Sequence, residues 1–255
     1  MSERLLLSLA TGIGIGAAAG YLGSLMLSRR MALVAGPLGH LTLPGVALAL
    51  LYGFDVSLGA FPFVVLGILL IWAFELRTRL PMEALTAIVF SSSVAAAFLF
   101  LPIAQAEAAL VGDIARVGRG DTLASVAASL LVVLGARALY PRLALVNISE
   151  ELAASEGVDV RRTNLLYLCL IAVIVTLGVK VVGGLLTAAL VAIPPAVARN
   201  LTRTMRAYAL VSLAVGATSA TLGVLAHALS GQPAGPLIIL INAALFLGSL
   251  ALARR

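Results

Sequence analysis

Long apolar runs separated by short polar segments make up almost the whole chain. Nine runs come close to the roughly 20 residues that an α-helix needs to cross a hydrocarbon layer of about 30 Å. We therefore predict an all-α integral membrane protein with about nine transmembrane helices in a single domain, residues 1–255. Only Lys180 and Gly183–Gly184 divide the sixth run from the seventh, so eight or ten spans are alternatives. The runs lie at residues 5–27, 31–52, 58–76, 82–104, 122–141, 164–180, 181–199, 206–229 and 235–253.

The one long polar stretch, residues 147–162, predicts a short helix outside the membrane. Ser149 is a suitable N-cap, and Glu150 and Glu151 then fall in the first turn, where the helix dipole favours carboxylates. Gly157 is a suitable C-terminal stop. A helix of about two turns is not stable alone in water, so it needs support from the rest of the chain. An ordinary solvated loop is the alternative.

Composition agrees with a membrane protein. Hydrophobic residues make up 62% of the chain, charged residues 11%, and the mean hydropathy is +1.12. A soluble core of this size could not hide so much apolar surface. The net charge is +6, but its arginines stand in short clusters between apolar runs, which orients a membrane protein and does not indicate a nucleic-acid partner. Cys169 is the only cysteine, so no internal disulfide can form.

The same clusters predict an orientation. With nine spans, thirteen of the 17 arginines and lysines fall on one face. Because the cationic side of a membrane protein is cytoplasmic, the polar loop 142–164 and the C-terminus should lie in the cytoplasm and the N-terminus outside. The cations left on the outer face are Arg4, Arg116, Arg119 and Lys180.

Two of the predicted helices contain residues that interrupt a helix. His40 lies in the second run among several glycines and prolines, and Gly183–Gly184 and Pro194–Pro195 flank the seventh run. Backbone freed at membrane depth is tolerated only against protein or a water-filled cavity, and a pair of interrupted helices indicates a transport pathway. His40 is then the candidate pathway residue, with a histidine bonded to a backbone carbonyl as the equal alternative. The interrupting residues around His40 are Gly36, Pro37, Gly39, Pro44 and Gly45.

Glycines also predict close helix packing. Gly12, Gly16 and Gly20 have small-xxx-small spacing, which favours contact within one bundle over a dimer seam.

Motifs of catalysis are missing from the sequence. It has no Walker A motif, no nucleophile elbow and no dinucleotide fingerprint, and neither CxxC nor HExxH. We therefore expect no enzyme activity and no cofactor bound by this chain.

Seven short segments, in order and at consistent spacing, resemble the membrane permeases of zinc-, manganese- and iron-type ABC importers over nearly the whole length. They are Arg29-Arg30-Met31-Ala32, HLTLPGV (40–46), Gly112-Asp113-Ile114, ELAASEGV (151–158), KVVGGLL (180–186), Ile193-Pro194-Pro195-Ala196 and Gly235-Pro236.

The resemblance implies partners. In that family a cytoplasmic helix with an E-x-A-x-x-x-G pattern docks into a groove on a separate ATPase subunit, which hydrolyses ATP. Here Glu151, Ala153 and Gly157, with Glu150 beside them, would form this coupling helix. An extracytoplasmic substrate-binding protein would be a second partner.

Docking of that binding protein could involve the outer face. Arg116 and Arg119 are candidates for contacts with its carboxylates. Local ion pairing with Asp113 and Asp121, which lie close in the sequence, is the alternative.

The cargo implied is a divalent metal ion such as zinc or manganese, or a metal chelate. Two copies of the chain would form a homodimer in membrane lipid, with His40, Pro44 and Gly45 along a pathway on the two-fold axis. Family members that carry metal usually have an aspartate four residues before the histidine, where this chain has Gly36. An ABC permease for a non-metal solute is therefore one alternative. An ion-coupled carrier is another, although in-span carboxylates are scarce.

Overall fold

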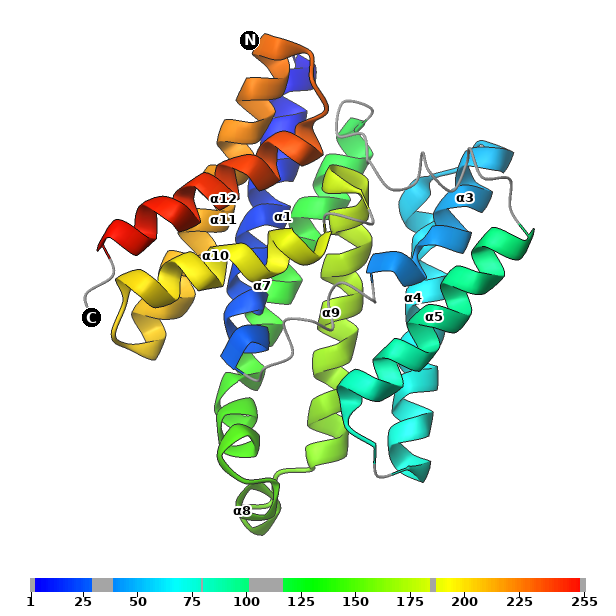
Figure 1. Ribbon diagram of the computed structural model, residues 1–255, viewed down its shortest axis with the longest axis vertical. Helices are drawn as coiled ribbons and strands as arrows, with labels where there is room; N and C mark the ends of the chain where they lie inside the picture. Colours follow the sequence, from blue (N-terminus) through cyan, green and yellow to red (C-terminus); the bar gives the residue numbers. More distant parts are fainter. Residues whose placement is uncertain (1–2, 29–38, 79, 101–116, 184–186, 253–255) are drawn as a thin grey trace.

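The structure, a computed structural model, describes residues 3–28, 39–78, 80–100, 117–183 and 187–252. These residues form helices joined by short turns, with no strand among them. The helices are α1 (Glu3–Ser28), α3 (Leu43–Tyr52), α4 (Val56–Arg77), α5 (Met82–Phe100), α7 (Arg119–Ile148), α8 (Glu150–Ser155), α9 (Val160–Val182), α10 (Thr187–Leu201), α11 (Met205–Ser230) and α12 (Ala234–Leu252) (Figure 1).

Six of these helices are long and apolar enough to cross a membrane: α1, α4, α7, α9, α11 and α12. The apolar helices at Gly39–Tyr52 and Ala84–Leu99 are shorter. Helix α10 has 15 residues, which at 1.5 Å per residue is about 22 Å, less than the hydrocarbon thickness. The prediction of an all-helical membrane protein is confirmed for the described residues, whereas the count of nine spans stays a prediction.

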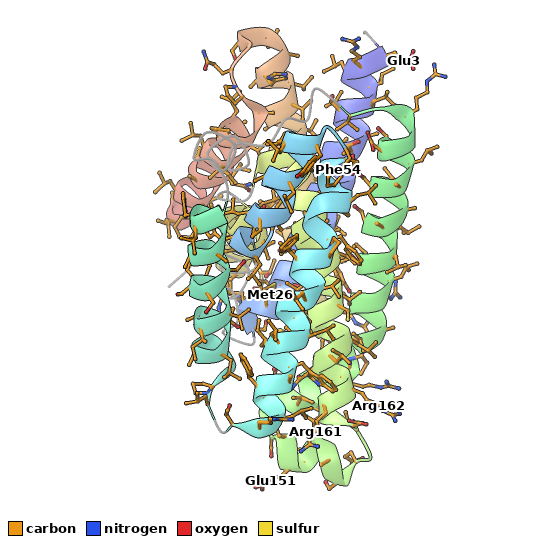
Figure 2. All side chains as sticks on the ribbon, turned by 90° about the vertical axis from the view of Figure 1, so that its right-hand side faces the viewer. Glu3, Met26, Phe54, Glu151, Arg161 and Arg162 are labelled. Atoms are coloured by element: carbon orange, nitrogen blue, oxygen red, sulfur yellow. The ribbon has the colours of Figure 1, made fainter. Side chains whose placement is uncertain are left out.

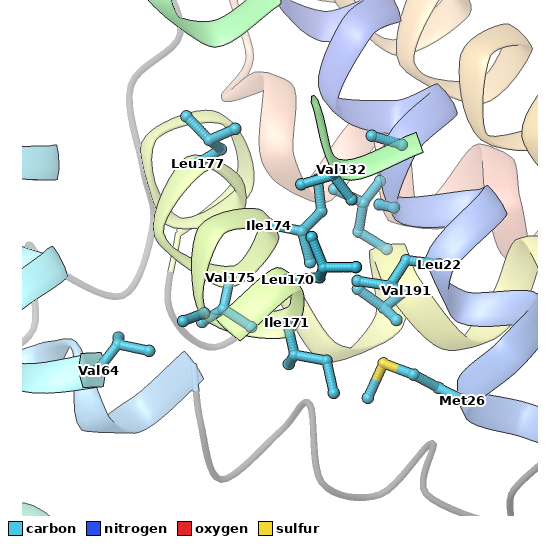
Figure 3. Close-up of a cluster of buried hydrophobic side chains, with 14 of the residues drawn as sticks. Leu22, Met26, Val64, Val132, Leu170, Ile171, Ile174, Val175, Leu177 and Val191 are labelled. Atoms are coloured by element: carbon cyan, nitrogen blue, oxygen red, sulfur yellow. The ribbon is translucent and has the colours of Figure 1, made fainter. Parts of the chain in front are cut away.

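Helix α9 lies at the centre of the bundle. In its most apolar window 72% of the residues are buried, against 22–50% in the other five candidate spans. It contacts α1, α4, α7, α10 and α12. Burial on several sides explains why its sequence is apolar for most of its length. Figure 3 shows Leu170, Ile171, Ile174 and Val175 of α9 among Leu22 and Met26 of α1, Val132 of α7 and Val191 of α10.

Helices α1 and α11 are in backbone contact. A Cβ atom on Gly16 would collide with the carbonyl of Gly216, and one on Gly20 would collide with the carbonyl of Ser212. The Ser212 hydroxyl donates to the carbonyl of Gly20 over 2.6 Å. Since lipid offers helices little hydrophobic incentive to associate, close packing of this kind is a main source of affinity between them. The predicted packing within one bundle is thus confirmed at Gly16 and Gly20.

Helix α7 extends further than its apolar run. It has 30 residues and continues through Pro141 to Ile148, while α9 already begins at Val160. Proline lacks an N–H, so the Arg137 carbonyl loses its intrahelical partner, but packing of α7 on α1 and α9 maintains the helix. Of the loop predicted at 142–164, residues 142–148 belong to α7 and residues 160–164 to α9, and its cytoplasmic location stays a prediction.

The long apolar run around residue 183 forms two helices, as predicted. Gly183 ends α9 at a φ of 84°, and its carbonyl accepts a hydrogen bond of 2.7 Å from the Thr187 hydroxyl at the start of α10. Pro194–Pro195, however, lies inside α10 and does not interrupt it. Pro195 leaves the carbonyl of Val191 without a helical donor, and Gly23 of α1 packs against that carbonyl.

The α1–α11 contact predicts a specific sensitivity. Gly216→Leu should destabilise the bundle by about 1–3 kcal/mol, because the new side chain meets the backbone of α1 and not a movable side chain. Thermal unfolding of the purified chain in detergent measures the effect. The control is Gly248→Leu, since nothing lies within 4 Å of a Cβ at that position in α12. Equal melting of the two variants would contradict the assigned role of the contact.

Candidate functional site

The helix around His40 has an irregular turn at Thr42 in its described part. Residues 39–41 are helical, Thr42 is a turn, and α3 begins at Leu43. The Thr42 hydroxyl donates to the carbonyl of Gly39 over 2.5 Å. Because Pro44 has no N–H, the carbonyl of His40 has no helical donor four residues on. The hydrogen bonding of the helix is therefore irregular at this point, while Gly36 and Pro37 lie outside the described residues and the predicted interruption stays a prediction.

The His40 ring is half-buried against α5. Its centroid is 5.3 Å from that of Phe90, and the two rings are tilted by 48°. Among the described residues no group of three or more His, Cys, Asp or Glu side chains could hold a metal ion. The described part of one chain thus supplies one imidazole here and no complete metal site.

Pro44 and Gly45 have different surroundings. Pro44 lines a cavity of about 570 Å³ between α3, α4 and α5, whose walls are apolar apart from the hydroxyls of Ser92 and Ser93. Gly45 lies against Gly59 of α4 so closely that a Cβ on either residue would collide with the backbone of the other. Gly45 therefore permits the close α3–α4 crossing, and a role of either residue in a pathway stays a prediction.

The polar stretch forms the short helix α8. The Ser149 side chain accepts a hydrogen bond of 3.2 Å from the amide of Leu152, as expected of an N-cap. Glu150 and Glu151 occupy the first turn, next to the positive end of the helix dipole. The predicted short capped helix is thus present, although the helical residues end at Ser155.

Gly157 closes α8 in a Schellman motif. Its N–H donates to the carbonyl of Ala154 over 3.1 Å, and the N–H of Val158 donates to that of Ala153 over 2.9 Å. Gly157 has a φ of 77°, and nothing lies within 4 Å of a Cβ at this position. The motif therefore needs glycine for its backbone conformation and not for space, and the predicted stop is confirmed.

Helix α8 projects from one end of the bundle. Ala153 is fully buried and holds α8 to α7 and α9. Ile148 and Leu152 are 75% and 43% exposed, and Glu150 and Glu151 are also exposed. The result is a small apolar and acidic surface with well-defined backbone, of the kind that another protein can contact.

The surroundings of α8 are charged. Figure 2 shows Glu151, Arg161 and Arg162 at this end of the molecule and Glu3 at the opposite end. Arg162 pairs with Asp159, 3.1 Å from Nε to Oδ2, and the Asp159 side chain accepts from the Arg162 amide over 3.0 Å. This pair fixes the chain where it leaves α8 and enters α9.

Arg119 is paired, but not with its neighbours in the sequence. Its Nε donates to Glu3 of α1, and both side chains are more than half exposed. Asp121 instead accepts a hydrogen bond of 3.0 Å from the amide of Gly118, at the start of α7. For Arg119 the ion pair therefore connects α7 to α1, and its role in docking stays a prediction. Arg116 lies outside the described residues.

One polar contact between spans was not anticipated. Glu75 of α4 is half-buried, and its Oε1 lies 3.5 Å from Nδ2 of Asn164 of α9. In the sequence, Glu75 is visible as a carboxylate one residue before the end of the apolar run 58–76. The partner on α9 could not be read from that signal, because 89 residues separate the two positions.

Comparisons with known proteins all match membrane transport proteins. The profile of the ABC 3 transport family matches residues 1–253. The chain is 28% identical over 250 residues to the manganese import system permease protein ScaB of Streptococcus gordonii, covering 96% of this chain and 90% of that protein. It is 26% identical over 245 residues to the high-affinity zinc uptake system membrane protein ZnuB of Buchnera aphidicola, covering 92% of each.

A solved structure has the same fold. It is PsaBC from Streptococcus pneumoniae in complex with Fab, which matches with a TM-score of 0.83 and 26% sequence identity, over 98% of this chain and 92% of that chain.

Proposed function

Because the chain belongs to the ABC 3 transport family, we propose that it is the membrane permease subunit of an ABC importer for a divalent metal ion or a metal chelate. Similarity to a manganese and a zinc permease over at least nine-tenths of this chain supports manganese or zinc as cargo. The family is one of transport permeases and not of catalytic subunits. The resemblance seen in the sequence is thereby confirmed.

Helix α8 is the observation that carries the proposal. A membrane protein has little reason to build a six-residue helix with an N-cap, a Schellman motif and a buried anchor, yet leave Leu152 and Ile148 exposed. A groove on a separate ATPase subunit that receives α8 accounts for these features. Glu150 and Glu151 would then face that subunit, while Ala153 and Gly157 shape the helix.

The pathway we propose lies between two copies of the chain. His40 is the ionisable side chain beside the irregular turn at Thr42, and the described part of one chain completes no metal site around it. Two imidazoles, one from each copy of a homodimer, would bind a borderline cation weakly enough to release it. Pro44 supports this role by freeing the carbonyl of His40, and Gly45 by bringing α3 against α4.

The orientation follows from the cations. With nine spans, α8 and the C-terminus are cytoplasmic, and the Glu3–Arg119 pair is on the outer face of the cell membrane. There an extracytoplasmic binding protein would deliver the cargo. Arg119 is paired but exposed, so with Arg116 it can still attract carboxylates of that protein.

Two alternatives have unequal support. Membership of the family gives no support to an ion-coupled carrier. A non-metal cargo remains the second candidate for one reason, the glycine at position 36 where metal permeases of the family have aspartate.

Metal uptake tests the proposed function. In cells that lack their own importers, the chain with its ATPase and binding protein should restore manganese or zinc uptake. His40→Ala and His40→Gln should both lower that uptake at least tenfold, about 1.4 kcal/mol in the binding of the cation, since glutamine is a poor ligand for it. Failure of the wild type to carry any metal would refute the cargo. Full uptake by His40→Gln would instead show that the role of His40 is structural.

Gly157→Val tests the coupling helix. Valine at a φ of 77° costs about 1–3 kcal/mol and should open the Schellman motif. We expect cargo-stimulated ATP hydrolysis and transport to fall together, while the amount of chain in the membrane stays constant. Gly157→Asn is the matched control, because asparagine tolerates this backbone conformation. Normal coupling in Gly157→Val would argue against docking through α8.

Docking on the outer face is tested by charge reversal. Arg116→Glu with Arg119→Glu should weaken binding-protein affinity severalfold at low salt, and the loss should shrink as salt rises. Glu3→Gln serves as control, since it breaks the ion pair of Arg119 without removing a cation. Unchanged affinity for the binding protein in the double variant would show that the two arginines have only a structural role.

A further inference from the structure

Helices α1, α7 and α11 enclose a groove that the proposed function does not use. Its volume is about 550 Å³, within the range of sites that bind small molecules. It lies towards the end of the bundle where α1 ends and α11 begins (Figure 1), whereas α7 continues past it from Pro141 to Ile148. Its lining residues are Tyr21, Val133, Arg137, Tyr140, Pro141, Met205, Arg206, Ala209, Leu210 and Leu213.

One part of this groove is cationic. Arg137 of α7 and Arg206 of α11 both line it, together with the phenol groups of Tyr21 and Tyr140, and its described lining includes no carboxylate. Two guanidinium groups and two hydroxyls on separate helices can donate to one tetrahedral anion, whereas a lone surface arginine cannot enclose it.

The positive charge extends past the groove. A neighbouring hollow of about 340 Å³ shares Met205 with it and is lined by Arg199 and Arg203. The polar residues of this hollow are Ser28, Thr202, Thr204 and Tyr208. An anion at Arg137 and Arg206 would therefore also experience the field of two further cations.

The other part of the groove is apolar and lies next to exposed leucines. Val133, Leu210 and Leu213 line it, and the leucines on the flanking faces of α7 and α11 are well exposed: Leu131 by 59%, Leu134 by 56% and Leu210 by 62%. In a membrane such side chains face hydrocarbon. A cationic end and an apolar side wall in one groove match a phospholipid, with its phosphate at the arginines and an acyl chain along the leucines.

We propose that the groove between α1, α7 and α11 binds an anionic phospholipid of the leaflet on the α8 side of the membrane. The site does not depend on which solute the protein carries. A bound lipid would hold together helices α7 and α11, which contact each other chiefly through α1 among the described elements.

Lipid retention by the full-length chain tests the site. The probe is phosphatidylglycerol against phosphatidylcholine in mixed nanodiscs, with bound lipid counted by native mass spectrometry. The wild type should retain phosphatidylglycerol preferentially. Arg137→Gln with Arg206→Gln should reduce that preference roughly thirtyfold, since each cation near a charged headgroup contributes about fivefold. Arg142→Gln with Arg161→Gln is the matched control, which removes the same charge from exposed positions outside the groove.

Three outcomes would overturn the proposal. One is equal retention of phosphatidylglycerol by the groove variant and the wild type. Another is complete displacement of the lipid by millimolar inorganic phosphate, which would make this a site for the free anion. The third is rapid disulfide cross-linking of two chains through Leu210→Cys in a Cys169→Ser background, which would show a second copy covering the groove.

Discussion

Direct contact between the backbones of α1 and α11 is the interaction on which the rest of the bundle depends. Glycines at positions 16, 20 and 216 remove the side chains that would otherwise separate the two helices. Helix α1 can then also contact α7, α9 and α10. In lipid no gain from removing water compensates for a loose fit, so the position of every neighbour of α1 follows from how closely these two helices approach.

A second constraint is that a carbonyl without its helical donor must lie where something tolerates it. The chain meets this constraint in different ways. The Val191 carbonyl, freed by Pro195, is covered by Gly23 of α1 and is structural. The His40 carbonyl, freed by Pro44, lies beside a half-buried imidazole and a turn. A proline inside an apolar run thus contributes to helix packing in α10. Next to α3, a proline in the same setting lies at the candidate pathway.

What the sequence could predict depended on the distance between interacting residues. The cap at Ser149 and the stop at Gly157 were correct because both act on amides within a few residues. The pairing of Arg119 with Glu3 could not be predicted, because Glu3 lies 116 residues away on another helix. Helix α7 continues past the end of its apolar run at residue 141, because its packing against α1 and α9 outweighs the tendency of Pro141 to break a helix. The groove at Arg137 and Arg206 is formed by three helices, so only the fold could reveal it.

The arrangement of contacts also has a mechanical consequence. Helices α3, α4 and α5 form one packed group, α1, α7, α10, α11 and α12 form another, and among the described elements their main connection is the contact of α4 with α9. Helix α8 is attached where α9 begins. A rod of 23 residues is about 35 Å long, so a tilt of about 5° at one end moves the other by roughly 3 Å. Because α9 contacts both groups, a tilt of α9 would move them relative to each other while each remains stiff inside.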